Sequence, residues 1–585
     1  MTDVSKAAKA SGSILLIGFL GLYLTDFITG YGLASVHPMV LLPLMGTALF
    51  AAAGFWLQKY KKAYTALCFI VLFLLYSCRV WPDNFTSYLW CEDGIAMISD
   101  AIFSGPSSLF DASNGSCWFI PRFISFISYQ ICLLFRDITY LPQLQGFITK
   151  ALAAGCLMYF MSDRFEWLVK ERAWRFVICA MVVLAIPGSA YETMPVDTSV
   201  PFVLNFTVFL IGLDTLLGPV RRPVSIGETV LLTIQAVSTA AAPFCGAVAV
   251  FACARWLFVK PEKDRSARGV VTGIVCTLVV SGATLFQLLT TLMSSREVSE
   301  LSLGRRLVVC TQDFVFFPYL TSYENVLLWI LGLAGWVIIV LLAKLSWKLI
   351  AYCAAYGYAF LFYCSMTGEP DQITEVIETG IGARYYMMNY MIAFLLLGVC
   401  INLLFASDRV RKLDGAVLLL AVLVIAYPTY LIDMPNVESA FSYDYCSNLF
   451  DPEGDNKLVI PVAPDARYRM VIPWDSSDYK SSGCDAQAFL ETVNGQNVND
   501  VIYLTDEQEE VLITVQTADK NGNTFEYVFF DWGGGQWACP VSVESDRYTF
   551  NVPGEHIREG VVSFIGITAD GERYDWSADF DIVVQ

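Results

Sequence analysis

Two adjacent carboxylates, Glu92 and Asp93, lie in the stretch LWCEDGIAMISD, shortly after an apolar run. A carboxylate can take a proton from an attacking hydroxyl group, and Gly94 directly after Asp93 would let a second molecule approach closely. Arg122 follows in the same segment, and a guanidinium group can hold a phosphate in a bidentate fork. These residue types could serve a displacement in which a hydroxyl group attacks and a phosphate leaves.

More polar side chains border apolar runs elsewhere in the chain. Arg384 and Tyr385 lie in IGARYYMMNY, Glu192 lies in PGSAYETMPVD, and Lys150 interrupts an apolar segment. Arg384 and Arg122 are the candidate phosphate ligands. Lys150, Tyr385 and Glu192 are further candidates for contact with a substrate.

Simpler interpretations stay open for several of these residues. Glu92 and Asp93 could be solvated loop charges, or a pair at a helix N-terminus, where the helix dipole favours negative charge. Lys150 could be a snorkelling or ion-paired lysine. Tyr385 could belong to an interfacial aromatic belt.

The composition indicates a membrane protein. Of the 585 residues, 56% are hydrophobic and 16% are charged, whereas a soluble domain is about 25% charged. The apolar residues form repeated runs of about 17 to 25 residues, the length that crosses a bilayer as a helix. We therefore expect a polytopic α-helical membrane protein with about thirteen transmembrane helices. The expected spans are 13–35, 38–57, 63–80, 143–162, 174–190, 199–217, 227–242, 244–258, 270–292, 326–343, 348–365, 386–405 and 414–433.

The positions of lysine and arginine orient this topology. Basic residues cluster in alternate loops, which places those loops in the cytoplasm if segment 118–136 does not cross the membrane. We assign 118–136 as a surface-lying or re-entrant helix, with a true span as the alternative. The N-terminus is then cytoplasmic, and the chain after 433 is extracytoplasmic.

The charge divides the chain into regions. From 434 onward there are 27 Asp and Glu against 8 Lys and Arg, which leaves 28 acidic and 29 basic residues in 1–433. We expect a transmembrane domain over 1–433 with an outer loop at 81–142, a connecting segment over 434–484 and an acidic domain over 485–585. Such an acidic domain is a poor partner for nucleic acid.

The acidic region alternates apolar and polar residues in short runs such as VLITVQT, FEYVFFDW and VVSFIGITA. Runs of period two at this spacing predict an all-β, sandwich-like domain. A structural cap and a carbohydrate-binding module are both open as its role. The aromatic residues that could stack on sugars are Trp532, Trp537, Tyr548 and Trp576.

Several catalytic classes find little support. The two histidines, His37 and His556, are far apart in sequence, and no CxxC pair suggests zinc. A nucleotide-binding loop of the form GxxxxGK[ST] is not present, so we expect neither cofactor nor metal. Cys91 and Cys117 flank the acidic segment and could form a disulfide. An odd number of cysteines lies in the C-terminal region, namely Cys446, Cys484 and Cys539.

The motifs together resemble the GT-C superfamily of membrane glycosyltransferases, in an uncharacterised bacterial subgroup. The similar elements are the EDG block ending in Pro121–Arg122, SAYETMPVD before a span that contains Asn205, ARYY at the start of a late span, and LVIPVAPDARYRMVIP. They cover roughly 60–475. The carboxylates follow the third expected span rather than the first, and the acidic sandwich is an addition to the family's pattern.

The resemblance implies an inverting transferase that moves a sugar from a polyprenyl-phosphate donor to a glycan or lipid-linked acceptor of the cell envelope. It implies Asp93 as general base, with Glu92 as second choice, and a location in the plasma membrane. Two alternatives remain, a transporter or flippase for a lipid-linked glycan and a polysaccharide polymerase, which shares the lipid-phosphate leaving group.

Overall fold

The structure is a computed structural model of the chain. With gaps of one or two residues, it describes 46–77, 97–113, 116–185, 200–239, 242–259, 267–293, 302–316, 337–367, 387–404, 443–462, 469–475, 480–481, 487–497, 502–504, 510–518, 525–557 and 560–584. The chain divides into two compact units. The first comprises Met1–Phe85, Phe110–Pro121 and Gly146–Asp433, and the second comprises Thr86–Leu109, Arg122–Gln145 and Met434–Gln585.

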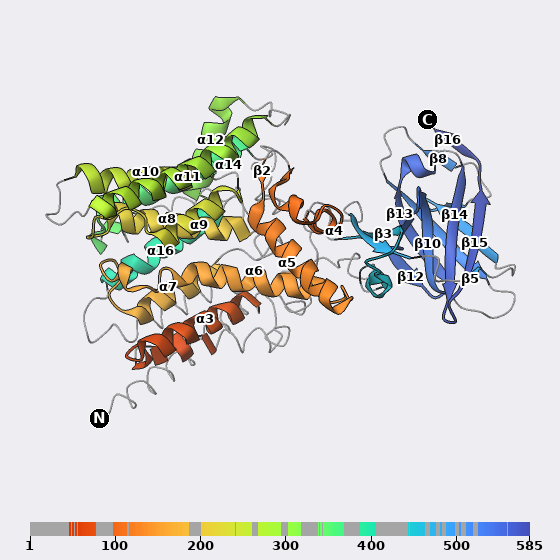
Figure 1. Ribbon diagram of the computed structural model, residues 1–585, viewed down its shortest axis with the longest axis horizontal. Coiled ribbons are helices and arrows are strands. Elements are labelled where there is room, and N and C mark those ends of the chain that lie inside the picture. The colour runs from red at the N-terminus through yellow and green to blue at the C-terminus, as the bar shows by residue number, and fades with distance from the viewer. Residues whose placement is uncertain are drawn as a thin grey trace. The chain divides into compact units, whose positions relative to one another are not determined.

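The first unit is helical (Figure 1). Its main helices are α3 (Lys61–Ser77), most of α6 (Leu141–Met158), α7 (Arg172–Ala185), α8 (Val200–Leu217), α9 (Ile226–Ala236), α10 (Ala242–Phe258), α11 (Ala267–Met293), α12 (Leu303–Phe316), α14 (Trp347–Thr367) and α16 (Met387–Leu404). Helices α8, α9, α10 and α11 pack side by side (Figure 1). Helix α16 packs against α7, α8 and α14.

Small residues let these helices approach closely. A side chain at Gly246 of α10 would collide with Thr284 of α11, and one at Gly398 of α16 would collide with Ile178 of α7. Between α8 and α14, the ring of Tyr352 stacks on that of Phe209 at 5.2 Å between ring centres. Its hydroxyl donates a hydrogen bond of 2.8 Å to the carbonyl of Phe209. The helical interior is therefore closely packed at these crossings.

The predicted number of membrane spans is wrong. Among the described residues, two helices are long and apolar enough to cross a bilayer, α8 and α11. Helices α5 (Phe119–Phe135) and α10 have 17 residues, α7 has 14 and α9 has 11, and each is shorter than α8, which has 18. The predicted spans 13–35 and 414–433 lie outside the described residues, as does most of 326–343.

The physical reason for the error is that an apolar run has more than one use. In α8, 83% of the most apolar window is buried, so its side chains form the interior of the helical unit. In α11, 22% is buried, and the 27-residue helix is about 40 Å long. Hydropathy has the same sign in both helices and does not distinguish protein neighbours from lipid.

The second unit contains the β-rich C-terminal region, which agrees with the predicted all-β domain. A seven-stranded sheet has the order β4-β3-β11-β10-β14-β15-β5, and a five-stranded sheet has the order β12-β13-β9-β6-β7. The first sheet consists of β3 (Asn456–Pro461), β4 (Arg469–Trp474), β5 (Lys480–Ser481), β10 (Phe525–Gly533), β11 (Gln536–Ala538), β14 (Val561–Thr568) and β15 (Glu572–Asp579). The second consists of β6 (Gln487–Val493), β7 (Gln496–Asn497), β9 (Glu510–Ala518), β12 (Ser542–Glu544) and β13 (Arg547–Pro553).

Two features set the architecture of these sheets. Buried side chains from both sheets, including Ile513, Val515, Phe530, Phe550 and Phe564, share one hydrophobic core. Strands β3, β4 and β5 lie within 434–484, the stretch that was predicted to be a connecting segment. Strand β3 pairs in parallel with β11 and antiparallel with β4. The β-structure therefore starts at Asn456 rather than near 485.

The second unit also takes in segments from the first third of the chain. Ile98, Tyr129 and Ile138 are buried in a single core with Ile460 and Ile472. Most of α5 and the short helix α4 (Ser99–Phe103) belong to this unit. Helix α5 therefore contributes to the core of the β-rich unit, and the assignment of 118–136 as a segment that does not cross the membrane stays a prediction.

Candidate functional site

The residues just after the acidic pair are held by an ion pair. Glu92 and Asp93 themselves lie outside the described residues. From α5, the Nη1 of Arg122 donates a hydrogen bond of 2.7 Å to Oδ2 of Asp100 in the first turn of α4. The side chain of Arg122 is 2% exposed and that of Asp100 is 37% exposed. This guanidinium group is thus committed to a carboxylate at the protein surface.

The same short helix is joined to the sheet. Ser99 accepts a hydrogen bond of 3.1 Å at Oγ from the backbone N–H of Val471 in β4. Next to it, the ammonium group of Lys457 lies 5.0 Å from the ring centre of Phe103. Helix α4 therefore contacts α5 through Asp100 and the sheet through Ser99, which fixes the chain seven residues after Glu92.

Further polar contacts support α5 within the second unit. The side-chain amide of Gln145 donates to Oγ of Ser125 at 2.9 Å, and both side chains are buried. The hydroxyl of Tyr443 donates to the carbonyl of Ile138. A disulfide joins Cys446 to Cys539 across 93 residues. It accounts for two of the three C-terminal cysteines.

The other predicted site residues are not brought together by the described structure. Lys150 is half-buried in α6, in the first unit, whereas Arg122 is in the second. Glu192, Arg384 and Tyr385 lie outside the described residues. Cys91 does too, so the predicted bridge to Cys117 stays a prediction; Cys117 is buried, and its backbone N–H donates to Gln287.

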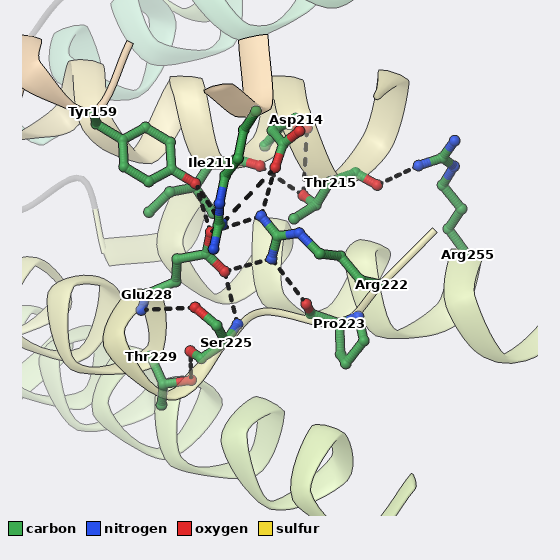
Figure 2. Close-up of polar contacts among 12 residues, drawn as sticks. Tyr159, Ile211, Asp214, Thr215, Arg222, Pro223, Ser225, Glu228, Thr229 and Arg255 are labelled. Atoms are coloured by element: carbon green, nitrogen blue, oxygen red, sulfur yellow. Dashed lines mark hydrogen bonds and ion pairs between the residues drawn. The ribbon is translucent and has the colours of Figure 1, made fainter. Parts of the chain in front are cut away.

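A second polar cluster, which the sequence analysis did not identify, lies in the helical unit (Figure 2). Arg222 lies between Glu228 and Asp214, donating to both oxygens of Glu228 at 2.6 and 2.7 Å and to Oδ2 of Asp214. Arg164 also pairs with Glu228, and the hydroxyl of Tyr159 donates to it at 2.5 Å. Two carboxylates thus face two guanidinium groups.

Local sequence explains part of this cluster. Ser225 and Glu228 form a capping box at the start of α9: the backbone N–H of Ser225 donates to Oε2 of Glu228 at 2.7 Å, and Oγ of Ser225 accepts from the N–H of Glu228. At the end of α8, Arg255 donates to the carbonyl of Thr215 (Figure 2). It also donates to the carbonyl of Gly218. The S-x-x-E spacing was the signal in the sequence that could have revealed the cap.

The electrostatics of the cluster indicate a structural role, in which ion pairs hold two helix ends together. Burial acts to raise the pKa of Glu228, but the hydrogen bonds and charge of Arg222 outweigh it and lower the pKa to about 2. A carboxylate held ionised and fully hydrogen-bonded is a poor proton acceptor near neutral pH. The cluster therefore ties the end of α8 to the start of α9, and it offers little for catalysis.

The aromatic residues proposed for sugar stacking are engaged within their own unit. Tyr548 is buried, and its hydroxyl donates to the carbonyl of Phe525. The ring of Trp576 packs on Phe525 and Phe564. Arg469 lies 4.9 Å from the ring centre of Trp532, and Arg573 lies 5.7 Å from that of Trp537. These contacts cover ring faces that a sugar would need.

Comparison with family models, characterised proteins and solved structures gave no match. Within the described ranges, no three His, Cys, Asp or Glu side chains come together as metal ligands would. The described polar arrangement that follows the predicted carboxylates in sequence is the Asp100–Arg122 pair, with further hydrogen bonds between Gln145 and Ser125 and between Val471 and Ser99.

Proposed function

We propose that the protein is a membrane-associated glycosyltransferase that moves a sugar from a polyprenyl-phosphate donor to an extracytoplasmic glycan or lipid-linked acceptor, with inversion. The observation that carries the proposal is the Asp100–Arg122 ion pair, in which the guanidinium group is buried and the carboxylate is partly exposed. It fixes the chain shortly after Met97, which is four residues after Asp93, and a catalytic carboxylate needs a supported position.

In the proposed reaction, Asp93 takes the proton of the acceptor hydroxyl as the hydroxyl oxygen attacks the anomeric carbon. The bond between that carbon and the phosphate oxygen of the donor breaks, and the lipid phosphate leaves with the electron pair. Arg384 stabilises the charge on the leaving phosphate. Attack on the face opposite the leaving group inverts the anomeric configuration, and Glu92 is the second candidate for the base.

Arg122 receives a different role from the one that the sequence suggested. Because its side chain is 2% exposed and its guanidinium group is engaged by Asp100, we assign it to positioning the loop rather than to binding phosphate. Lys150, Tyr385 and Glu192 stay candidates for substrate contact.

Two features support a site at an extracytoplasmic membrane surface. Helix α11 exposes large apolar side chains along its length, among them Val271, Leu278, Phe286 and Met293, which suits contact with lipid. The Cys446–Cys539 disulfide suits an oxidising compartment. The segment after the acidic pair belongs to the same compact unit as the C-terminal region. We therefore place both on the same side of the membrane.

The test is transfer by the purified full-length protein from polyprenyl-phosphate sugars, measured as release of polyprenyl phosphate. Asp93→Asn keeps the shape of the side chain and removes its basicity, so we expect transfer to fall by about 10²-fold or more with donor binding nearly unchanged. Glu92→Gln is the matched control and should have the smaller effect. Full activity of Asp93→Asn would remove the proposal's residue-level support, and lipid translocation without transfer would favour the transporter.

A further inference from the structure

A turn rich in lysine and aromatic residues joins two packed helical stretches of the helical unit. A helical stretch over 46–57 folds back on α3, so that the ring of Phe50 stacks on that of Tyr64 at 5.6 Å between ring centres. The turn between them lies within WLQKYKK, residues 56–62, and no Asp or Glu occurs over 46–77. The turn therefore carries three positive charges with no carboxylate in the same segment.

The backbone of this turn is held in place by hydrogen bonds. The N–H of Gln58 donates to the carbonyl of Gly54 at 2.9 Å. The N–H of Tyr60 donates to the carbonyl of Leu57 at the same distance. The side-chain oxygen of Gln58 also accepts a bond of 3.3 Å from the N–H of Ala173 in α7, and α3 packs against α7 (Figure 1). The side chains of the turn are therefore presented from a fixed backbone.

Lys59 lies over two aromatic rings. Its Nζ is 4.5 Å from the ring centre of Trp56 and 4.9 Å from that of Tyr60. Trp56 is 43% exposed and Tyr60 is 55% exposed, so the ammonium group and both rings lie at the surface. An ammonium group over an aromatic face keeps N–H donors for an anion. Trp and Tyr are the side chains that typically lie at the headgroup level of a bilayer.

The loop between α6 and α7 lies beside the turn. The Nζ of Lys61 is 3.6 Å from Oδ2 of Asp163, and Oδ1 of Asp163 accepts a hydrogen bond of 3.0 Å from Nε of Arg172. Lys170 in this loop is exposed. Residues 162–175 contain four Lys and Arg against three Asp and Glu. The loop therefore leaves the surface around the turn positively charged.

An exposed apolar stripe continues from the turn along α3. Leu67, Ile70 and Leu74 are 41%, 49% and 44% exposed. Tyr60, Leu67 and Leu74 fall on one helix face, because seven residues are close to two helical turns, and together they extend over about 20 Å. Nucleic acid or an acidic protein would need the cations and not the stripe, whereas a bilayer presents phosphate and hydrocarbon next to each other.

We propose that residues 56–62 and the exposed stripe of α3 bind the surface of a bilayer that contains anionic phospholipid. The ammonium groups of Lys59 and Lys62 contact lipid phosphates. The rings of Trp56 and Tyr60 lie at headgroup level, and the stripe contacts the acyl chains. Basic loops of membrane proteins face the cytoplasm, where the leaflet carries anionic lipid, so the proposal assigns this surface to the cytoplasmic leaflet.

The experiment uses the full-length protein in detergent and brominated phosphatidylglycerol as the probe, because bromine atoms quench the fluorescence of nearby tryptophan. Brominated phosphatidylcholine has the same chains without net charge. We expect phosphatidylglycerol to bind the parent chain about tenfold more tightly than phosphatidylcholine at low salt. The difference should disappear at about 1 M salt, where the Debye length is about 3 Å.

Lys59→Gln combined with Lys62→Gln removes two exposed charges, so phosphatidylglycerol should bind about tenfold more weakly or worse. Unchanged phosphatidylcholine binding would show that this variant is folded. Trp56→Phe should reduce the amplitude of quenching, because it removes a reporter at the surface. The matched control combines Arg136→Gln with Arg547→Gln, two exposed cations of the β-rich unit, and should leave phosphatidylglycerol binding as it is in the parent.

Three results would overturn the inference. The first is equal binding of the two lipids by the parent chain, and the second is undiminished phosphatidylglycerol binding by the double lysine variant. The third is equally tight binding of heparin, a soluble polyanion, because the surface would then recognise anions in general. None of these measurements involves transfer by Asp93→Asn, so the inference and the proposed function are tested separately.

Discussion

Arg122, near the start of α5, donates a 2.7 Å hydrogen bond to Asp100, 22 residues earlier in the chain. The guanidinium group is buried and the carboxylate is partly exposed. This ion pair joins α4, which begins six residues after Asp93, to α5. Breaking this contact tests the positioning role directly.

Asp100→Asn should destabilise the protein by about 1–3 kcal/mol, because a buried guanidinium group loses its counter-charge. We also expect a lower kcat for sugar transfer with little change in KM, since the loop rather than the donor site is disturbed. The measurements are denaturant unfolding and steady-state kinetics. The control is Arg136→Ala, which breaks the exposed pair with Glu453 and should cost about 1 kcal/mol or less. Equal effects of the two variants would contradict the positioning role.

Glu228→Gln should lower the stability of the helical unit by about 3 kcal/mol, because Arg222 and Arg164 both lose charge-assisted partners. Thermal unfolding would measure the change. Lys61→Ala, which removes an exposed partner of Asp163, is the control and should change stability by less than about 1 kcal/mol. Substrate binding normalised to the amount of folded protein should stay constant in Glu228→Gln. A loss of activity without a loss of stability would show that the cluster takes part in function and is not purely structural.

Cys446→Ser should destabilise the β-rich unit by about 2–4 kcal/mol, since the disulfide closes a long loop in the unfolded chain. Unfolding with and without reductant would measure the effect; reductant should destabilise the parent chain by a similar amount and leave Cys446→Ser unchanged. Cys132→Ser, a buried thiol of the same unit, controls for the loss of a small apolar group and should respond to reductant as the parent does. If reductant leaves the parent unchanged, the bridge does not stabilise the fold.

Acidification should destabilise the β-rich unit through His556. Burial lowers the pKa of this histidine below 6.5; Glu555 opposes the shift and Arg469 adds to it. The unfolded chain therefore binds the proton first, so the stabilising contribution is present above about pH 6.5 and is lost as the pH falls through the lower folded-state pKa. His556→Phe keeps an aromatic edge against Trp532 and should flatten the stability profile below about pH 6.5.

The β-rich domain was predictable because strands leave a local pattern. Alternation in VLITVQT and FEYVFFDW matches β9 and β10, whose inward residues Ile513, Val515 and Phe530 are buried. The earlier start of the domain was not predictable in the same way. Strand β3 pairs with β11, which lies about 80 residues later in the chain, and no local pattern identifies such a partner.

The apolar character and the segregation of acidic charge in the C-terminal region followed from composition alone, because both depend only on which residues are present. The number of spanning helices did not, since an apolar run can face protein, as in α8, or stay exposed, as in α11. The polar residues show the same division. Sequence marked Glu92, Asp93 and Arg122 by type, but only the tertiary structure showed that Arg122 faces Asp100 and that Lys61 faces Asp163. Such pairings depend on distances between segments far apart in the chain, and those distances are set by packing rather than by any single stretch of residues.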